Sequence, residues 1–65
     1  MEWVLEISTY AEMSISGMLV VTNNLMTYDG IPSLQRCVEV MNETVQSFSA
    51  EELIHVTQMV CYSTY

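Results

Sequence analysis

The 65-residue sequence predicts a single all-α domain over residues 1–65, with one long N-terminal helix followed by two shorter helices. Three observations predict this fold. Apolar residues recur at steps of three and four through residues 3–25, the same spacing returns after residue 33, and a helix-capping pattern occupies residues 49–52. The alternative is an α+β fold, in which an N-terminal β-hairpin packs on two helices.

The first predicted helix covers residues 3–25. Its apolar stripe has one polar member, Ser14, and six apolar ones: Val4, Ile7, Ala11, Met18, Val21 and Leu25. Residues 13–22 also show a weaker alternation of apolar and polar side chains, which is typical of a strand. In that alternative, Asn23-Asn24 forms a tight turn into a second strand over 25–28. The longer stripe favours the helix, with Gly17 as the point where it bends.

Residues 29–32 predict a break, because Gly30 favours a helix end and Pro32 favours the first turn of a new helix. The second helix therefore begins near residues 31–33. Its inner face is formed by residues spaced four and three apart: Leu34, Val38, Met41, Val45 and Phe48. On its surface, Arg36 has Glu39 as an acidic partner three residues ahead.

Ser49 and Glu52 have the spacing of a capping box, in which each side chain accepts a hydrogen bond from the other's backbone amide. Phe48 and Leu53 flank this cap as a hydrophobic staple. The third helix is therefore expected to begin at Ala50. Its inner face is expected to contain Leu53, Val56 and Val60.

Apolar residues make up 51% of the chain, which is more than so small a domain hides easily. We therefore expect a homo-oligomer, with a dimer favoured over larger assemblies. The predicted interface is the apolar stripe of the first helix: Val4, Ile7, Ala11, Met18, Val21 and Leu25.

Eight acidic residues face a single basic one, Arg36, which gives a net charge of −7. Such a chain repels phosphate backbones, so we expect no direct binding of nucleic acid. It attracts a protein partner with a basic surface. The expected partner-binding residues are acidic side chains of the two shorter helices and aromatic anchors near the chain ends: Glu39, Glu43, Glu51, Glu52, Trp3, Tyr62 and Tyr65.

No apolar run is long enough to span a bilayer, and the first charged residue, Glu2, is unlike the basic start of an export signal. These features predict a cytoplasmic protein without membrane contact. Small acidic chains of this kind are common among viral and mobile-element accessory proteins, for which the compartment is the host cell. In a reducing cytosol, Cys37 and Cys61 are expected to be buried free thiols, although aligned helices would let them pair.

The sequence shows no catalytic constellation, so we expect no enzyme activity, metal site or cofactor. His55 has Glu51 and Glu52 nearby but no nucleophile at a matching spacing, and is expected to be a partly covered surface residue. The predicted function is a non-enzymatic interaction or regulatory module that binds and modulates or inhibits a partner protein. The alternatives are a nucleic-acid mimic, which requires the acidic residues and Asp29 on one surface, and a structural subunit of a larger assembly.

Overall fold

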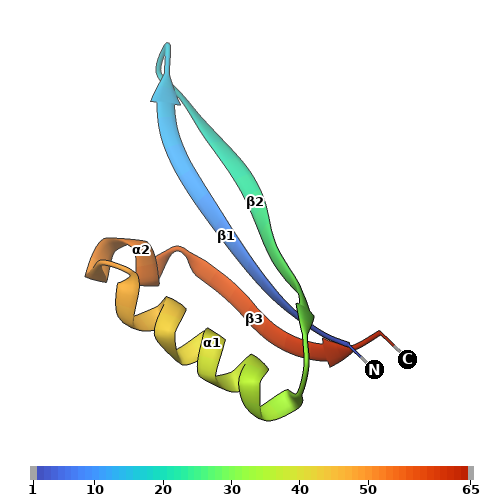
Figure 1. The fold of residues 1–65 in the computed structure, drawn as a ribbon. Helices are drawn as coiled ribbons and strands as arrows, with labels where there is room; N and C mark the ends of the chain where they lie inside the picture. The colour runs from blue at the N-terminus through green and yellow to red at the C-terminus, as the bar shows by residue number, and fades with distance from the viewer. Residues whose placement is uncertain (1, 65) are drawn as a thin grey trace.

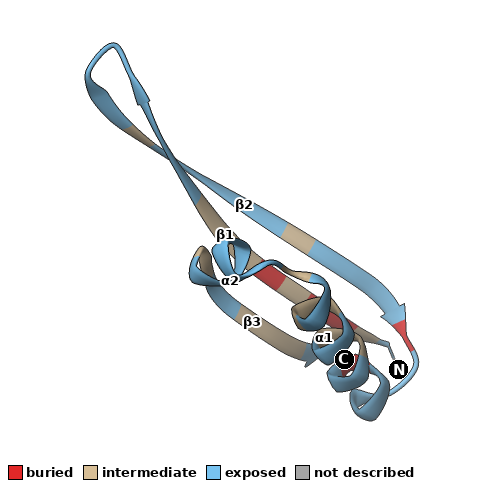
Figure 2. Ribbon diagram, turned by 90° about the vertical axis from the view of Figure 1, so that its left-hand side faces the viewer, coloured by how far each residue is buried: buried red, intermediate tan, exposed pale blue. Residues whose placement is uncertain are grey.

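The computed structural model describes residues 2–64, which form an α+β fold (Figure 1). The elements follow the order β1 (Trp3–Ile15), β2 (Met18–Ile31), α1 (Leu34–Ser47), α2 (Ala50–Ile54) and β3 (Val56–Ser63). The strands form an antiparallel sheet in the order β2-β1-β3, so the first strand lies at its centre. Both helices lie on one side of this sheet, next to β1 and β3 (Figures 1 and 2).

The prediction of an all-α fold is wrong, because residues 3–25 form a hairpin instead of a helix. The segment is rich in β-branched and aromatic residues, which pack well on a pleated sheet. Ser16 and Gly17 both have positive φ, 53° and 78°, as a two-residue type I′ turn requires. The alternative α+β class therefore fits, although its turn lies at residues 16–17 and not at Asn23-Asn24.

The break near Gly30 occurs where predicted, but it ends a strand and not a helix. The pairing runs from Trp3↔Ile31 to Leu5↔Tyr28, so Asp29 and Gly30 together oppose one residue of β1. Gly30 has a φ of 69°, the conformation that a glycine supplies at such a bulge. The bulge bends β2 into the short connection that leads to α1.

The second predicted helix is confirmed as α1, and its cap is Ser33, whose side chain accepts a hydrogen bond from the Arg36 amide at 3.1 Å. Its predicted inner face is wrong at Leu34 and Val38, which are exposed, whereas Cys37 and Val40 face the core. The capping box is also confirmed, with bonds of 3.2 and 3.1 Å between Ser49 and Glu52. The helix that it starts nevertheless ends at Ile54. The prediction of a longer third helix is wrong, because residues 56–63 pair with β1 as β3.

The core is small and lies between β1 and the first turns of α1. Leu5, Ile7 and Cys37 are fully buried, and Ile31 completes the cluster. Figure 2 shows buried segments on β1, beside the helices, and at the end of β2. Partly buried side chains from all three strands, from α1 and from the residue that follows it surround them: Trp3, Met26, Val40, Met41, Phe48, Val56, Met59 and Cys61.

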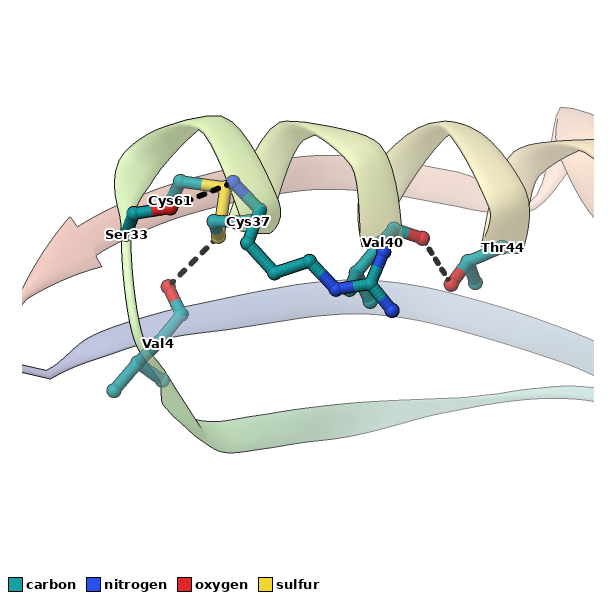
Figure 3. The surroundings of a disulfide bond; sticks show 7 residues. Val4, Ser33, Cys37, Val40, Thr44 and Cys61 are labelled. Atoms are coloured by element: carbon teal, nitrogen blue, oxygen red, sulfur yellow. Dashed lines mark hydrogen bonds between the residues drawn. A yellow bond between two sulfur atoms is a disulfide. The ribbon is translucent and has the colours of Figure 1, made fainter.

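A disulfide bond joins Cys37 of α1 to Cys61 of β3, so the expectation of free thiols is wrong (Figure 3). The Cα atoms of the two cysteines are 6.2 Å apart, a usual separation for a disulfide. The Sγ of Cys37 also lies 3.8 Å from the carbonyl oxygen of Val4 in β1. The bond therefore ties the helix layer to the sheet at the centre of the core.

Half of the hairpin projects beyond this core. The pairing of β1 with β3 ends at Thr9↔Val56, whereas the pairing of β1 with β2 continues to Ile15↔Met18. We call the projecting segment, residues 11–22, the arm; it extends past both helices in Figure 1. It makes the molecule long and thin, with principal extents of 48 × 24 × 13 Å.

Candidate protein-interaction surface

The arm exposes five large apolar side chains, each between 50% and 69% accessible: Met13, Ile15, Met18, Leu19 and Val21. Single exposed apolar residues are common on protein surfaces. Five of them on one narrow projection are unusual and mark a candidate contact surface. Residues 13–28 also contain no charged side chain, although the whole chain carries a net charge of −7. Apart from Glu12 near its base, the arm is therefore uncharged, although it belongs to a strongly acidic protein.

The strand register assigns these side chains to two faces of the arm. Ile15 pairs with Met18 and lies in the same alternating set as Met13, Ile7 and Leu5, which face the helices in the body. Leu19 and Val21 belong to the other set, so they lie on the face that points away from the helices. We call the face that carries Met13, Ile15 and Met18 the helix-side face of the arm.

A small cavity of ≈ 280 Å³ lies where the arm meets the body. Its lining combines apolar and polar side chains from the hairpin and from the end of the helix layer: Thr9, Tyr10, Met26, Phe48, Glu52 and His55. The rings of Tyr10 and His55 lie 4.9 Å apart at a tilt of 41°. His55 is partly buried, as expected, and the Tyr10 amide donates a hydrogen bond to its carbonyl oxygen at 2.9 Å.

The six residues of the predicted dimer interface do not form one surface. Val4 and Ile7 lie in the chain's own core. Ala11 and Met18 lie on the helix-side face of the arm, and the remaining two, Val21 and Leu25, lie on the opposite face. Steps of three and four residues keep side chains on one face of a helix. In a strand, successive side chains point to opposite faces, so a step of three moves a side chain to the other face.

The acidic residues expected to bind a partner come from α1 and α2. Glu39 and Glu43 lie 3.2 and 3.5 Å from the guanidinium of Arg36, so the predicted Arg36–Glu39 pair is confirmed and a second carboxylate joins it. Glu52 is occupied by the capping box, while Glu51 lies exposed beside it. The one basic side chain thus contacts two of the four carboxylates. This reduces the negative charge of the surface that a nucleic-acid mimic requires.

The expected aromatic anchors differ in their surroundings. Trp3 is partly buried against the chain's own core, and Tyr62 is exposed on β3. They belong to neighbouring strands but to opposite faces of the sheet, because Tyr62 pairs with Val4 and not with Trp3. Tyr65 lies outside the described residues. Trp3 and Tyr62 therefore do not form one site.

Tyr62 donates a hydrogen bond of 2.6 Å to the carboxylate of Glu6, and this bond raises the pKa of the phenol above its ordinary value of 10.0. Because the folded state holds the proton more tightly, the bond stabilises the fold below pH 10.0 and is lost as the pH rises through the raised pKa. We expect a near-ultraviolet titration to show one tyrosine ionising later than its ordinary pH. Tyr62→Phe should remove that late step, and Glu6→Gln should move it to lower pH. An unchanged curve in both variants would contradict the assignment.

Among residues 2–64, no group of three or more histidine, cysteine, aspartate or glutamate side chains is placed to hold a metal ion. Neither α1 nor α2, the helices of this described part, has the length and apolar character needed to cross a membrane. No family model, characterised protein or solved structure matches the chain.

The arm was not predicted from the sequence, although the sequence contains a strand pattern in this segment. The period-two pattern of Met13, Ile15, Leu19 and Val21, interleaved with Ser14, Ser16 and Val20, indicated strands in this segment. The cavity had no such signal. Its lining brings Thr9 and Tyr10 next to Glu52 and His55, more than forty residues along the chain, and only the pairing of β1 with β3 places them together.

Proposed function

We propose that this protein is a non-enzymatic interaction module that binds a partner protein through the helix-side face of its arm and thereby modulates or inhibits it. The observation that carries this proposal is the set of large apolar side chains held in water on the arm, with Met13, Ile15 and Met18 on one face. A contact that removes such a patch from water is favourable in proportion to the apolar area covered.

The chemistry of the surface defines the partner. The arm offers flexible methionine side chains, which adapt to different apolar surfaces. Beyond the arm, the acidic side chains of the body attract a partner whose apolar patch has a basic rim. The cavity at the base of the arm offers a recess for one side chain of that partner, with Met26 and Phe48 as apolar walls and Glu52 among the lining residues.

The test compares two sets of exposed apolar residues in affinity capture from cells that contain the partner. Met13→Ser with Met18→Ser replaces two of the three large exposed apolar side chains of the helix-side face and leaves Ile15. Ile54→Ser changes a residue of α2 that is 70% exposed, compared with 69% for Met18, and is the matched control. We expect proteins bound by the wild-type chain to be retained by the control and to fall at least tenfold in the arm variant.

A salt series on the same captured protein tests the acidic rim. We expect the amount captured to decrease as ionic strength rises, because added ions screen exposed charges. Equal capture by the arm variant and the wild-type chain would refute the proposal. Capture that is lost in the arm and Ile54 variants alike would also refute it, since binding would then not be specific to the arm.

A further inference from the structure

From the outer edge of β2 we infer that a second copy of this chain pairs with it, strand to strand and antiparallel, to make a six-stranded sheet. The contact uses the backbone edge of the hairpin and not the helix-side face, so it is independent of the proposed partner-binding function.

The edge of β2 is long and unprotected. β2 has 14 residues, and within residues 2–64 it pairs only with β1, on one side. Edge strands in soluble proteins are usually short or carry lysine, proline or inward-pointing charges, because open backbone groups attract another strand. β2 contains no lysine or proline, and its only charged residue is Asp29, at the bulge.

The turn determines which backbone groups face outward. In a hairpin with a two-residue loop, the flanking residues Ile15 and Met18 form a hydrogen-bonded pair, and the pairs then alternate. The hydrogen bond from the Tyr10 amide to His55 agrees with this alternation, because it points away from β2. The outward residues of β2 are every second one: Leu19, Val21, Asn23, Leu25 and Thr27.

This set is self-complementary. When two copies pair antiparallel about Asn23, Leu19 faces Thr27 and Val21 faces Leu25, and each outward residue gains a partner. The five outward residues of each copy then exchange about ten backbone hydrogen bonds. The same two-fold operation pairs the surface with itself, as closed dimers of identical chains require.

The distribution of charge favours the edge of β2, over the other strand edges, as the place where a second copy binds. Two chains that each carry −7 repel one another, so they can meet closely only where neither is charged. Residues 13–28 are the longest stretch of the hairpin that meets this condition, and in the pairing about Asn23 each Asp29 lies opposite the partner's turn at Gly17. The open edge of β1 beyond Thr9 is short and carries Glu12.

The outer edge of β3 is also free of charge but is less suited to pairing. It has 8 residues, and its large apolar side chains except Tyr62 are partly buried. On β2, by contrast, the outward residues Leu19, Val21 and Leu25 are 50–69% exposed. Pairing across β2 therefore covers apolar side chains and also gives hydrogen-bond partners to the open backbone amides and carbonyls of this strand.

The test measures molar mass by light scattering at micromolar concentration. We expect the wild-type chain to have twice the monomer mass of 7.4 kDa. Val21→Pro removes an outward amide while leaving the bonds between β2 and β1, so we expect the mass to fall twofold. Val21→Thr keeps that amide and the branched side chain, and is expected to remain a dimer.

Two further variants test the register and guard against misfolding. Val21→Lys and Leu25→Glu should each weaken the dimer, and mixing them should restore it, because the two side chains face one another across the edge. Circular dichroism must show the same sheet content in every variant. A wild-type monomer, or a dimer that survives Val21→Pro, would overturn the inference. Met13→Ser with Met18→Ser should leave the mass unchanged, so failure here and failure of the partner-binding proposal are distinguishable.

Discussion

Reducing the Cys37–Cys61 disulfide is expected to lower the free energy of unfolding by about 3 kcal/mol, because the bond closes a loop across 24 positions of the chain. A domain of this size has a total stability near the low end of about 5–15 kcal/mol. The loss is therefore a large part of the whole. We expect the urea midpoint of the reduced chain to fall well below that of the oxidised chain.

Reduction of the wild-type chain isolates the cross-link, because both sulfur atoms stay in place. The control is the double variant Cys37→Ala with Cys61→Ala, whose midpoint should not respond to reductant. Equal midpoints for oxidised and reduced wild-type protein would show that the bond contributes nothing to stability. A response of the double variant would show that the reductant acts elsewhere.

Truncating Leu5 is the second large expected effect. Its side chain is 0% exposed on the central strand, in one cluster with Ile7 of the same strand and Cys37 of α1. Leu5→Ala removes buried apolar atoms and leaves a cavity, which costs about 2–5 kcal/mol in protein cores. The upper part of that range is expected to unfold the chain at room temperature, because only a handful of the residues from 2 to 64 are buried.

The matched control is Ile54→Ala, which removes a similar volume from a side chain that is 70% exposed. It should change the free energy of unfolding by about 0.5 kcal/mol or less. Thermal or denaturant unfolding followed by circular dichroism measures both variants. Similar losses for Leu5→Ala and Ile54→Ala would contradict the position of the core between β1 and α1.

The second half of the chain was easier to predict than the first, and the reason is local chemistry. Ser49 and Glu52 form their capping box within four residues, and α1 has both a cap and a regular apolar stripe. These signals need no distant contact. The end of α2 at Ile54 and the strand after it depend on pairing with β1, which begins more than forty residues earlier.

The N-terminal half was mispredicted because two periodicities overlap in it. Val4, Ile7 and Ala11 fit a helix, whereas Met13, Ile15, Leu19 and Val21 fit a strand. The decisive feature was Ser16-Gly17, where two consecutive residues adopt positive φ and reverse the chain. This reversal produces the exposed arm. It also places the six residues of the predicted dimer interface on different surfaces.

The strand order β2-β1-β3 also has a consequence for synthesis on the ribosome. The central strand is made first, but one of its neighbours, β3, is made only after residue 55. The hairpin can close early, because its pairing is local. The body can form only after β3 has been made. A nascent chain therefore leaves Leu5 and Ile7 uncovered until translation has passed residue 63, and it is vulnerable to aggregation during that interval.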